Sequence, residues 1–179
     1  MRVITYDQLV AAPWANGGGI TREIAAQRDE DGLIWRISLA DVSSEGPFSS
    51  FAGLHRILTV IDGAGMVLET ADAPIPAAPL APVSFKGDLP VIGRLPEGPI
   101  RDLNVIFRPD RIAADVEVLR GPCEISPERD GTVLFVVAGA ARSGTQTLAP
   151  LTTVFDATEP VVLSQDARAL RITLTQTGA

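Results

Sequence analysis

Histidine and cysteine are nearly absent from this chain of 179 residues, which holds one of each, His55 and Cys123. Zinc, copper and iron bind proteins mainly through imidazole nitrogens and thiolates. One imidazole and one thiol do not make such a site, so we expect no metal and no other cofactor. A single cysteine also excludes an internal disulfide, which agrees with a reducing compartment.

Lysine and long apolar runs are also scarce. Lys86 is the single lysine among 15 basic residues, so a cationic site must rely on guanidinium groups, which bind carboxylates bidentately. The longest apolar stretches, such as 133–141, are about half of the ~20 residues that a membrane span needs, and the N-terminus lacks the pattern of a signal peptide. We therefore expect a cytoplasmic protein that does not bind a membrane.

The net charge is negative, at −7. A chain of this charge repels the phosphate backbone of nucleic acids and anionic lipid surfaces. We expect neither as a partner.

Alternation with a period of two residues dominates the chain. In 33–39, Leu33, Trp35, Ile37 and Leu39 share one face of a predicted strand. Six further short runs rich in β-branched residues lie between Gly, Pro or Asp, at 56–61, 102–107, 116–119, 133–137, 161–163 and 169–175. Single helical turns are predicted only at 6–11 and 108–115. Many short strands with frequent turns indicate an all-β sandwich or jelly-roll barrel.

A weak internal repeat favours two such barrels. Residues 58–64 are similar to 134–140 at an offset of 76, 80–83 to 148–151 at 68, and 103–107 to 170–174 at 67. The three segments keep their order. We therefore predict an N-terminal lobe over 1–110 and a smaller C-terminal lobe over 111–179.

Six linked motifs resemble those of a known family. They are Trp14-Ala15-Asn16-Gly17-Gly18-Gly19-Ile20-Thr21-Arg22-Glu23, Trp35-Arg36-Ile37-Ser38-Leu39-Ala40, Gly46-Pro47-Phe48-Ser49, Phe51-Ala52-Gly53-Leu54-His55-Arg56, Phe85-Lys86-Gly87-Asp88 and Arg101-Asp102-Leu103-Asn104. Their order and spacing resemble the HutD/Ves family of bicupin proteins. The chain departs from the family pattern at Ala15, where lysine is usual, and at His55, where an acidic residue is frequent.

The resemblance implies a fold and a function. The fold is a bicupin, two jelly-roll (RmlC-like) β-barrels in one chain, without the usual cupin metal ligands. The HutD branch is associated with bacterial histidine utilisation genes and is thought to bind a pathway metabolite, such as formylglutamate or urocanate, and to restrain the pathway. The Ves branch is tied to stress or temperature response.

The residues themselves indicate a polar pocket. Arg36 and Ser38 share a strand face that points either into a barrel or to solvent. Arg56 begins a strand that is apolar on both faces, which favours the mouth of a pocket. Asp102 and Asn104 share a face, and Asp102 is interpreted as orienting an arginine. The further candidate ligand-binding residues are Asn16 and Arg22 beside a Gly-rich turn, His55, and Phe85.

The role of the turn Gly17-Gly18-Gly19 stays open between a tight structural turn and a loop that offers backbone N–H groups to an anion. It lacks the spacing and the lysine of a phosphate-binding P-loop.

Two function classes compete. The first is a metal-free protein that binds a small carboxylate or amide metabolite and has no catalytic residue. The second is a small isomerase or hydrolase that uses Asp102, Glu23 or His55 as a general base beside an arginine. No carboxylate pair or Ser-His-Asp arrangement stands at a telling spacing, which favours binding. A homodimer that acts on a protein partner is a third hypothesis.

Overall fold

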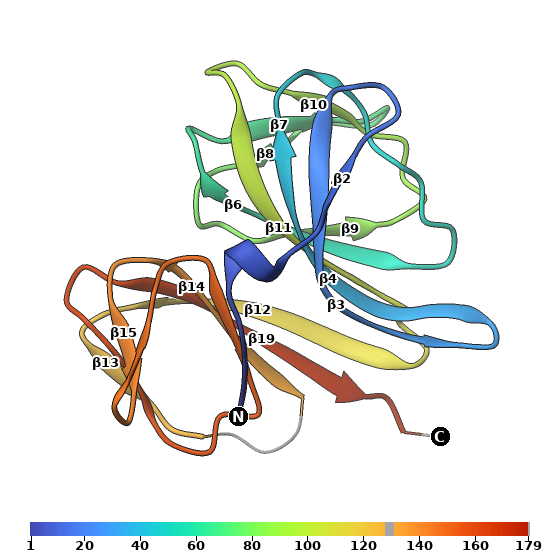
Figure 1. Ribbon diagram of the computed structural model, residues 1–179. Coiled ribbons are helices and arrows are strands. Elements are labelled where there is room, and N and C mark those ends of the chain that lie inside the picture. The colour runs from blue at the N-terminus through green and yellow to red at the C-terminus, as the bar shows by residue number, and fades with distance from the viewer. Residues whose placement is uncertain (128–130, 179) are drawn as a thin grey trace. The chain divides into compact units, whose positions relative to one another are not determined.

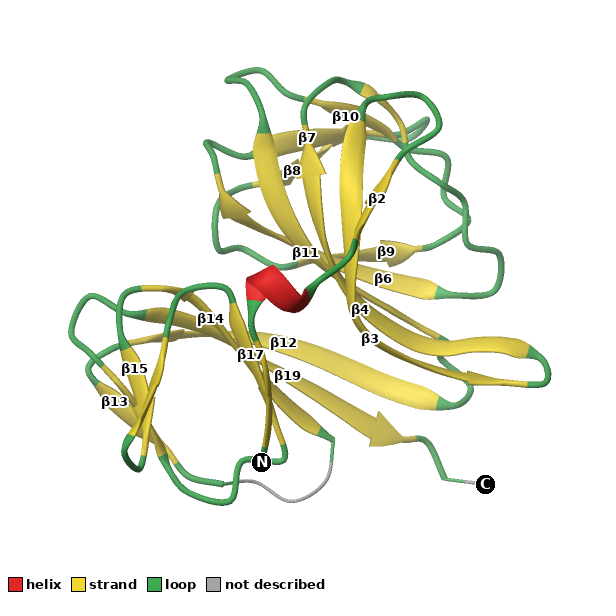
Figure 2. Ribbon diagram, viewed as in Figure 1, coloured by secondary structure: helices red, strands yellow, loops and turns green. Residues whose placement is uncertain are grey.

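The computed structural model describes residues 1–127 and 131–178, and these are almost entirely strands and turns (Figure 2). One helical turn, η1 (Tyr6–Gln8), is present at the first of the two positions predicted. The second predicted turn is wrong: Pro109 lies in a tight turn, and β12 begins at Ile112. No helix in the described part of the chain is long and apolar enough to cross a membrane.

The chain forms two compact units. The N-terminal unit comprises Val10–Ala113 and the chain end from Gln176, and the C-terminal unit comprises Met1–Leu9 and Ala114–Thr175. This division lies close to the boundary at 110/111 that the sequence indicates, but it assigns the first nine residues to the C-terminal unit. The reason is that β1 (Arg2–Ile4) pairs with a strand of that unit, β17 (Thr152–Phe155).

Two sheets build the N-terminal unit (Figure 1). The larger has the order β2 (Ala11–Pro13), β3 (Gly19–Asp29), β4 (Gly32–Val42), β11 (Ile100–Phe107), β6 (His55–Asp62) and β9 (Val83–Lys86). The smaller has the order β5 (Gly46–Pro47), β10 (Ile92–Arg94), β7 (Met66–Glu69) and β8 (Ile75–Ala77). Buried side chains from both sheets form one core cluster, which includes Leu58, Val60, Met66 and Leu68.

The C-terminal unit has the same plan (Figure 1). One sheet has the order β1, β17, β14 (Thr132–Ala138), β19 (Arg168–Gln176) and β12 (Ile112–Arg120). The other has the order β13 (Cys123–Ile125), β18 (Val161–Leu163), β15 (Ala141–Ser143) and β16 (Gln146–Leu148). The strands β4 to β11 therefore correspond one to one, in chain order and in sheet position, to β12 to β19.

Strand register supports the repeat that the sequence indicates. Leu103 pairs with Thr59, and Leu170 pairs with Phe135, so the offsets of 67 and 76 relate equivalent residues. Both strand pairs also contain a register shift at the same place, directly after the pair Asp102–Val60 in the N-terminal barrel and after the equivalent pair Ala169–Val136 in the C-terminal one. The two barrels are thus equivalent in detail as well as in outline.

The middle segment of the repeat needs a different alignment. Leu80 and Leu151 both have positive φ, 55° and 62°. The N–H of Leu80 donates to the carbonyl of Val60, and that of Leu151 donates to the carbonyl of Val136. Because Val60 and Val136 are themselves equivalent, Leu80 corresponds to Leu151, an offset of 71. The predicted offset of 68 is wrong because Leu80-Ala81-Pro82 begins at the turn residue, whereas Leu148-Ala149-Pro150 ends just before the equivalent turn residue, Leu151.

Candidate functional site

A cavity of about 290 Å³ opens in the N-terminal barrel. Four side chains that the sequence singled out lie in its wall, namely Arg36 and Ser38 on β4, Arg56 on β6 and Asn104 on β11, and two loops complete it. The lining residues are Trp14, Ala15, Asn16, Thr21, Arg36, Ser38, Ala40, Pro47, Phe48, Ser49, Phe51, Arg56, Asn104 and Ile106. Small-molecule sites generally start at about 300 Å³, so the cavity suits a compact metabolite.

Strand pairing explains why these side chains meet. Arg36 on β4 and Arg56 on β6 both pair with Ile106 of the central strand β11, and Ser38 pairs with Asn104. Paired residues in an antiparallel sheet project to the same face. The face of Arg36, which the sequence left open, is therefore the face toward the barrel interior.

Arg56 is buried, with 8% of its surface exposed. Its Nε donates to Asn104 Oδ1 at 2.6 Å, and the rings of Phe48 and Phe85 lie 4.5 and 5.6 Å from its guanidinium carbon. Burial is the main cause that lowers its pKa to about 10. Within the described residues its two Nη groups make no hydrogen bond, so they remain available to a ligand.

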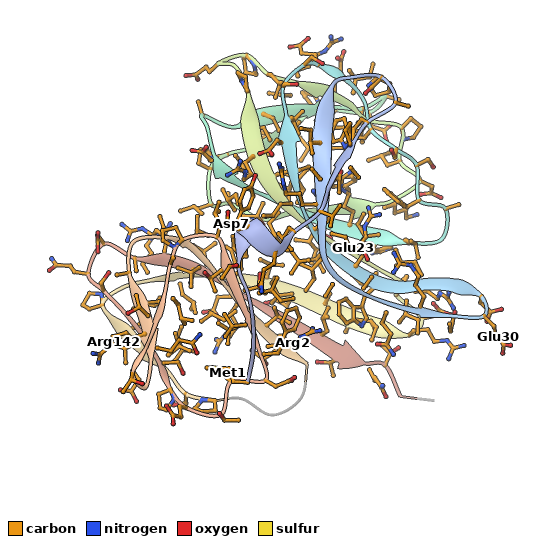
Figure 3. The ribbon with its side chains drawn as sticks, viewed as in Figure 1. Met1, Arg2, Asp7, Glu23, Glu30 and Arg142 are labelled. Carbon is orange, nitrogen blue, oxygen red and sulfur yellow. The ribbon has the colours of Figure 1, made fainter. Side chains whose placement is uncertain are left out.

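Arg36 is the second cation of the cavity. The ring of Phe51 lies 5.1 Å from its guanidinium carbon, and its buried Nε has no hydrogen-bond partner among the described residues. Burial lowers its pKa, while the carboxylate of Glu23 on β3, labelled in Figure 3, acts in the opposite direction. Glu23 is exposed and forms an ion pair with Arg28 at 2.7 Å, so it does not neutralise Arg36 by contact.

Asp102 is completely buried and is not part of the cavity lining. Asn104 Nδ2 donates to Asp102 Oδ1, whereas Asp102 Oδ2 has no partner within the described part of the chain. Burial raises the pKa of Asp102 to about 6, against the field of Arg56. The three side chains form a chain from Asp102 through Asn104 to Arg56.

The cavity is therefore electropositive. Neither Arg36 nor Arg56 forms an ion pair with any carboxylate in 1–127 or 131–178, and each lies against an aromatic ring that covers part of its guanidinium. An unpaired, desolvated guanidinium is unfavourable until an anion binds it. Two such guanidinium groups in one cavity have the chemistry to hold a small anionic group.

The Gly-rich turn packs as a structural element. Asn16 Oδ1 accepts from the N–H of Gly18 at 3.0 Å, which closes the turn, and Gly17 has φ +70°. A Cβ at Gly19 would lie 2.5 Å from the carbonyl oxygen of Asp41 and 3.0 Å from the ring of Trp14. Of this segment only Asn16 lines the cavity, beside Trp14 and Ala15.

Four of the nine predicted ligand-binding residues lie outside the lining. Arg22 is on the opposite face of the sheet, where it pairs with Asp41 at 2.5 Å. His55 packs its ring against Phe107 at 5.8 Å, also on that face, because it adjoins Arg56 on a strand and neighbours on a strand point to opposite sides. Phe85 and Asp102 reach the site only through Arg56 and Asn104.

Sequence reasoning missed the aromatic residues that cover the arginines. Phe48 and Phe51 belong to two of the motifs quoted above, but they lie in loops, where alternation gives no face. The sequence marks these two residues only as belonging to turns, since Phe48 follows Pro47 and Phe51 lies two residues before Gly53. Trp14 was also missed; its Nε1 donates to Thr21 Oγ1 at 2.8 Å, and both residues line the cavity.

The described residues of the C-terminal barrel enclose much less space at the equivalent position. Its corresponding interior space is about 20 Å³, room for one water molecule. At the repeat offsets of 76 and 67, Thr132 stands in place of Arg56 and Ala169 in place of Asp102. Ala169 and the apolar residues around it fill the interior instead.

Comparison with known proteins defines the class first. The chain has the fold of a cupin 2 conserved barrel domain protein from Leptotrichia buccalis, with a TM-score of 0.60 over 97% of this chain and 96% of that one at 11% identity. With its two equivalent barrels it is a bicupin.

The family follows from closer matches. The family model described as HutD matches residues 6–179, and the chain belongs to the HutD family. It is similar to HutD from Pseudomonas fluorescens, with a TM-score of 0.85, 35% identity and 99% of both chains covered. It is also 39% identical over 129 residues to an uncharacterised 21.2 kDa protein in the hutC 3′ region of Pseudomonas putida, a match that covers 70% of this chain and 68% of that one.

Proposed function

We propose that the N-terminal barrel binds a small carboxylate metabolite, of the type of formylglutamate or urocanate, and thereby modulates histidine utilisation without consuming the compound. The observation that carries this proposal is the pair of guanidinium groups, buried in Arg56 and half-buried in Arg36, that line one cavity and form no ion pair with a carboxylate among the described residues. An anion supplies the missing partner, and the charge-assisted hydrogen bonds that result are stronger than neutral ones.

The size and lining of the cavity support the same ligand class. A volume of about 290 Å³ fits an amino acid derivative rather than a nucleotide. Asn16, Ser38 and Asn104 add neutral polar groups that suit an amide or imidazole beside the carboxylate. The name of the relative from Pseudomonas putida, which places it in the hutC 3′ region, supports a link to histidine utilisation.

A hydrolase or isomerase finds less support in the geometry. A general base must come within hydrogen-bond reach of the substrate. Asp102 has 0% exposure, and His55 packs on the other face of β6, so neither side chain lines the cavity. Glu23 is exposed and paired with Arg28. We therefore propose binding without turnover.

Calorimetric titration of the protein with formylglutamate, urocanate, histidine and glutamate tests the proposal, with chromatography of each mixture afterwards. We expect saturable binding of one of the two histidine-pathway acids and full recovery of the compound. Loss of the compound would instead favour the enzyme hypothesis. No binding of any of the four would contradict the proposed ligand class.

Two variants provide the matched control. Arg36→Met removes a cation from the cavity, and Arg142→Met removes one from the exposed surface of β15 in the C-terminal barrel, where Figure 3 labels it. Both change the net charge by the same amount. Binding at the cavity predicts that only Arg36→Met weakens the affinity, by about 1.5–3 kcal/mol, the worth of a hydrogen bond to a charged group.

A further inference from the structure

The chain of side chains from Asp102 to Arg56 suggests how the site is regulated. Asp102 and Asn104 stand two residues apart on β11, so both project into the barrel. Asn104 contacts both neighbours: its Nδ2 donates to Asp102 Oδ1, and its Oδ1 accepts from Arg56 Nε. One amide thus separates the buried carboxyl group of Asp102 from the guanidinium of Arg56, which lines the cavity.

The surroundings of Asp102 make its charge sensitive to that guanidinium. Its cross-strand neighbours are Ala40 on β4 and Val60 on β6, and the core cluster that contains them continues with apolar residues of β7 and β8, among them Met66 and Ala77. Its Oδ2 has no donor in the described part of the protein. Burial removes the carboxylate from bulk solvent on that side, and no second hydrogen bond from the described residues stabilises its ionised form.

The charged groups that act on Asp102 come from two neighbouring strands. Arg56 on β6 favours its ionised form, and Asp41 on β4 disfavours it from the opposite face of the sheet, where Arg22 and Arg101 pair with Asp41 at 2.5 Å each. Arg36 on β4 acts on Arg56 in turn. Of these groups, Arg36 and Arg56 line the cavity.

We infer that an anion bound to Arg56 makes Asp102 take up a proton, so that ligand binding and protonation of Asp102 support each other. The inference rests on the proposed function, because it assumes an anionic ligand in this cavity. The anion neutralises the field of Arg56, which is the main stabiliser of the Asp102 carboxylate. It also adds a negative charge nearby, and like charges in a low-dielectric site disfavour ionisation.

The direction of the pH dependence follows. Asp102 in the unliganded protein has a pKa of about 6, and the bound anion raises it further. Well below pH 6 the carboxyl is protonated in both states, and affinity is constant. As the pH rises through 6 the free protein loses the proton first, so the affinity falls until the liganded protein also ionises. The interaction between the bound anion and the Asp102 carboxylate should lower the ligand affinity on the order of tenfold between pH 5.5 and pH 8.

The experiment measures the affinity for formylglutamate from pH 5.5 to 8, where both of its carboxylates stay ionised, in wild type and in Asp102→Asn. The asparagine keeps the shape and cannot titrate. We expect wild-type affinity to fall on the order of tenfold as the pH rises. Asp102→Asn should bind at pH 8 about as tightly as wild type does at pH 5.5, with no pH dependence. A positioning role alone predicts weaker binding by Asp102→Asn at every pH, which would overturn the inference.

A second measurement separates this inference from the proposed ligand. The carboxyl carbon of Asp102 is followed by NMR against pH with and without sulfate, an anion that is fully ionised in this range, and its resonance is assigned from its absence in Asp102→Asn. We expect sulfate to raise the titration midpoint in wild type and to leave it unchanged in Arg56→Met. If formylglutamate fails to bind but sulfate shifts the midpoint, the ligand is wrong and the coupling stands. An unshifted midpoint in wild type overturns the coupling.

Discussion

Replacing Arg56 with methionine should make the protein more stable while it removes binding. Methionine keeps most of the apolar contact with Phe48 and Phe85 and removes the buried guanidinium charge. The low pKa of Arg56, about 10, measures how strongly burial disfavours its charged form. That reduction corresponds to about 3 kcal/mol of unfavourable free energy.

The lost hydrogen bond to Asn104 offsets part of this gain. A hydrogen bond of this kind contributes about 1 kcal/mol, and Asn104 Oδ1 keeps no other donor among the described residues. The net expectation is an increase of about 2 kcal/mol in the free energy of unfolding at pH 7. Since the pKa of Arg56 is lower in the folded state than in the unfolded state, the unfavourable contribution is complete at pH 7 and declines only as the pH rises through about 10.

Thermal and urea unfolding at pH 7 measure the effect. An increase of about 2 kcal/mol corresponds to a Tm roughly 4–8 °C higher in a protein of this size. Arg142→Met, at an exposed position, should change stability by less than about 0.5 kcal/mol. A variant Arg56→Met that folds but unfolds several degrees earlier than wild type would refute the reasoning, because Arg56 would then be a structural residue.

Three other predictions follow from the same geometry. Asp102→Asn should raise stability at pH 7 by about 1–3 kcal/mol, and this gain should vanish below pH 4, because the pKa of Asp102 is raised from 3.8 to about 6 on folding; unfolding as a function of pH shows it. His55→Gln and Arg22→Gln should leave ligand affinity within twofold of wild type in calorimetry, since both side chains lie on the face away from the cavity. Gly19→Ala should lower stability by about 1–3 kcal/mol in urea unfolding, because its Cβ meets a carbonyl oxygen at 2.5 Å.

Alternation predicted the sheet well. The run at 33–39 lies within β4, and those at 56–61 and 102–107 lie within β6 and β11. The strand period also predicted that Arg36 and Ser38 share a face of their strand and that Asp102 and Asn104 share a face of theirs. The pairing of β4 with β11 puts all four side chains on the same face of the sheet. What the period could not give was which face is interior, since both faces of β4 carry apolar residues.

The sequence alone was enough to exclude His55 from the cavity lining. Adjacent residues of a strand cannot both face one cavity, so choosing Arg56 already excluded His55 from the lining. Phe48 and Phe51 were out of reach for a different reason. Their positions over the arginines depend on how two loops fold back onto the barrel, and no local pattern encodes that path.

Three short matches were enough to predict the repeat, but they did not show that the two barrels carry different side chains at the positions of the cavity. Equivalent positions hold Arg56 in one barrel and Thr132 in the other, and Asp102 is matched by Ala169. These differences become visible only after strand register fixes which residues are equivalent. Apolar side chains pack the interior of the C-terminal barrel and leave a space of about 20 Å³ there, against about 290 Å³ in the N-terminal barrel.

Two crystal structures test the central claim most directly, one of the protein crystallised with formylglutamate and one with urocanate. The claim predicts an intact ligand in the N-terminal cavity, with a carboxylate oxygen within about 3 Å of an Nη group of Arg56 and with Arg36 on the same ligand. An empty cavity under saturating concentrations of both compounds, or a ligand bound elsewhere on the protein, would contradict it.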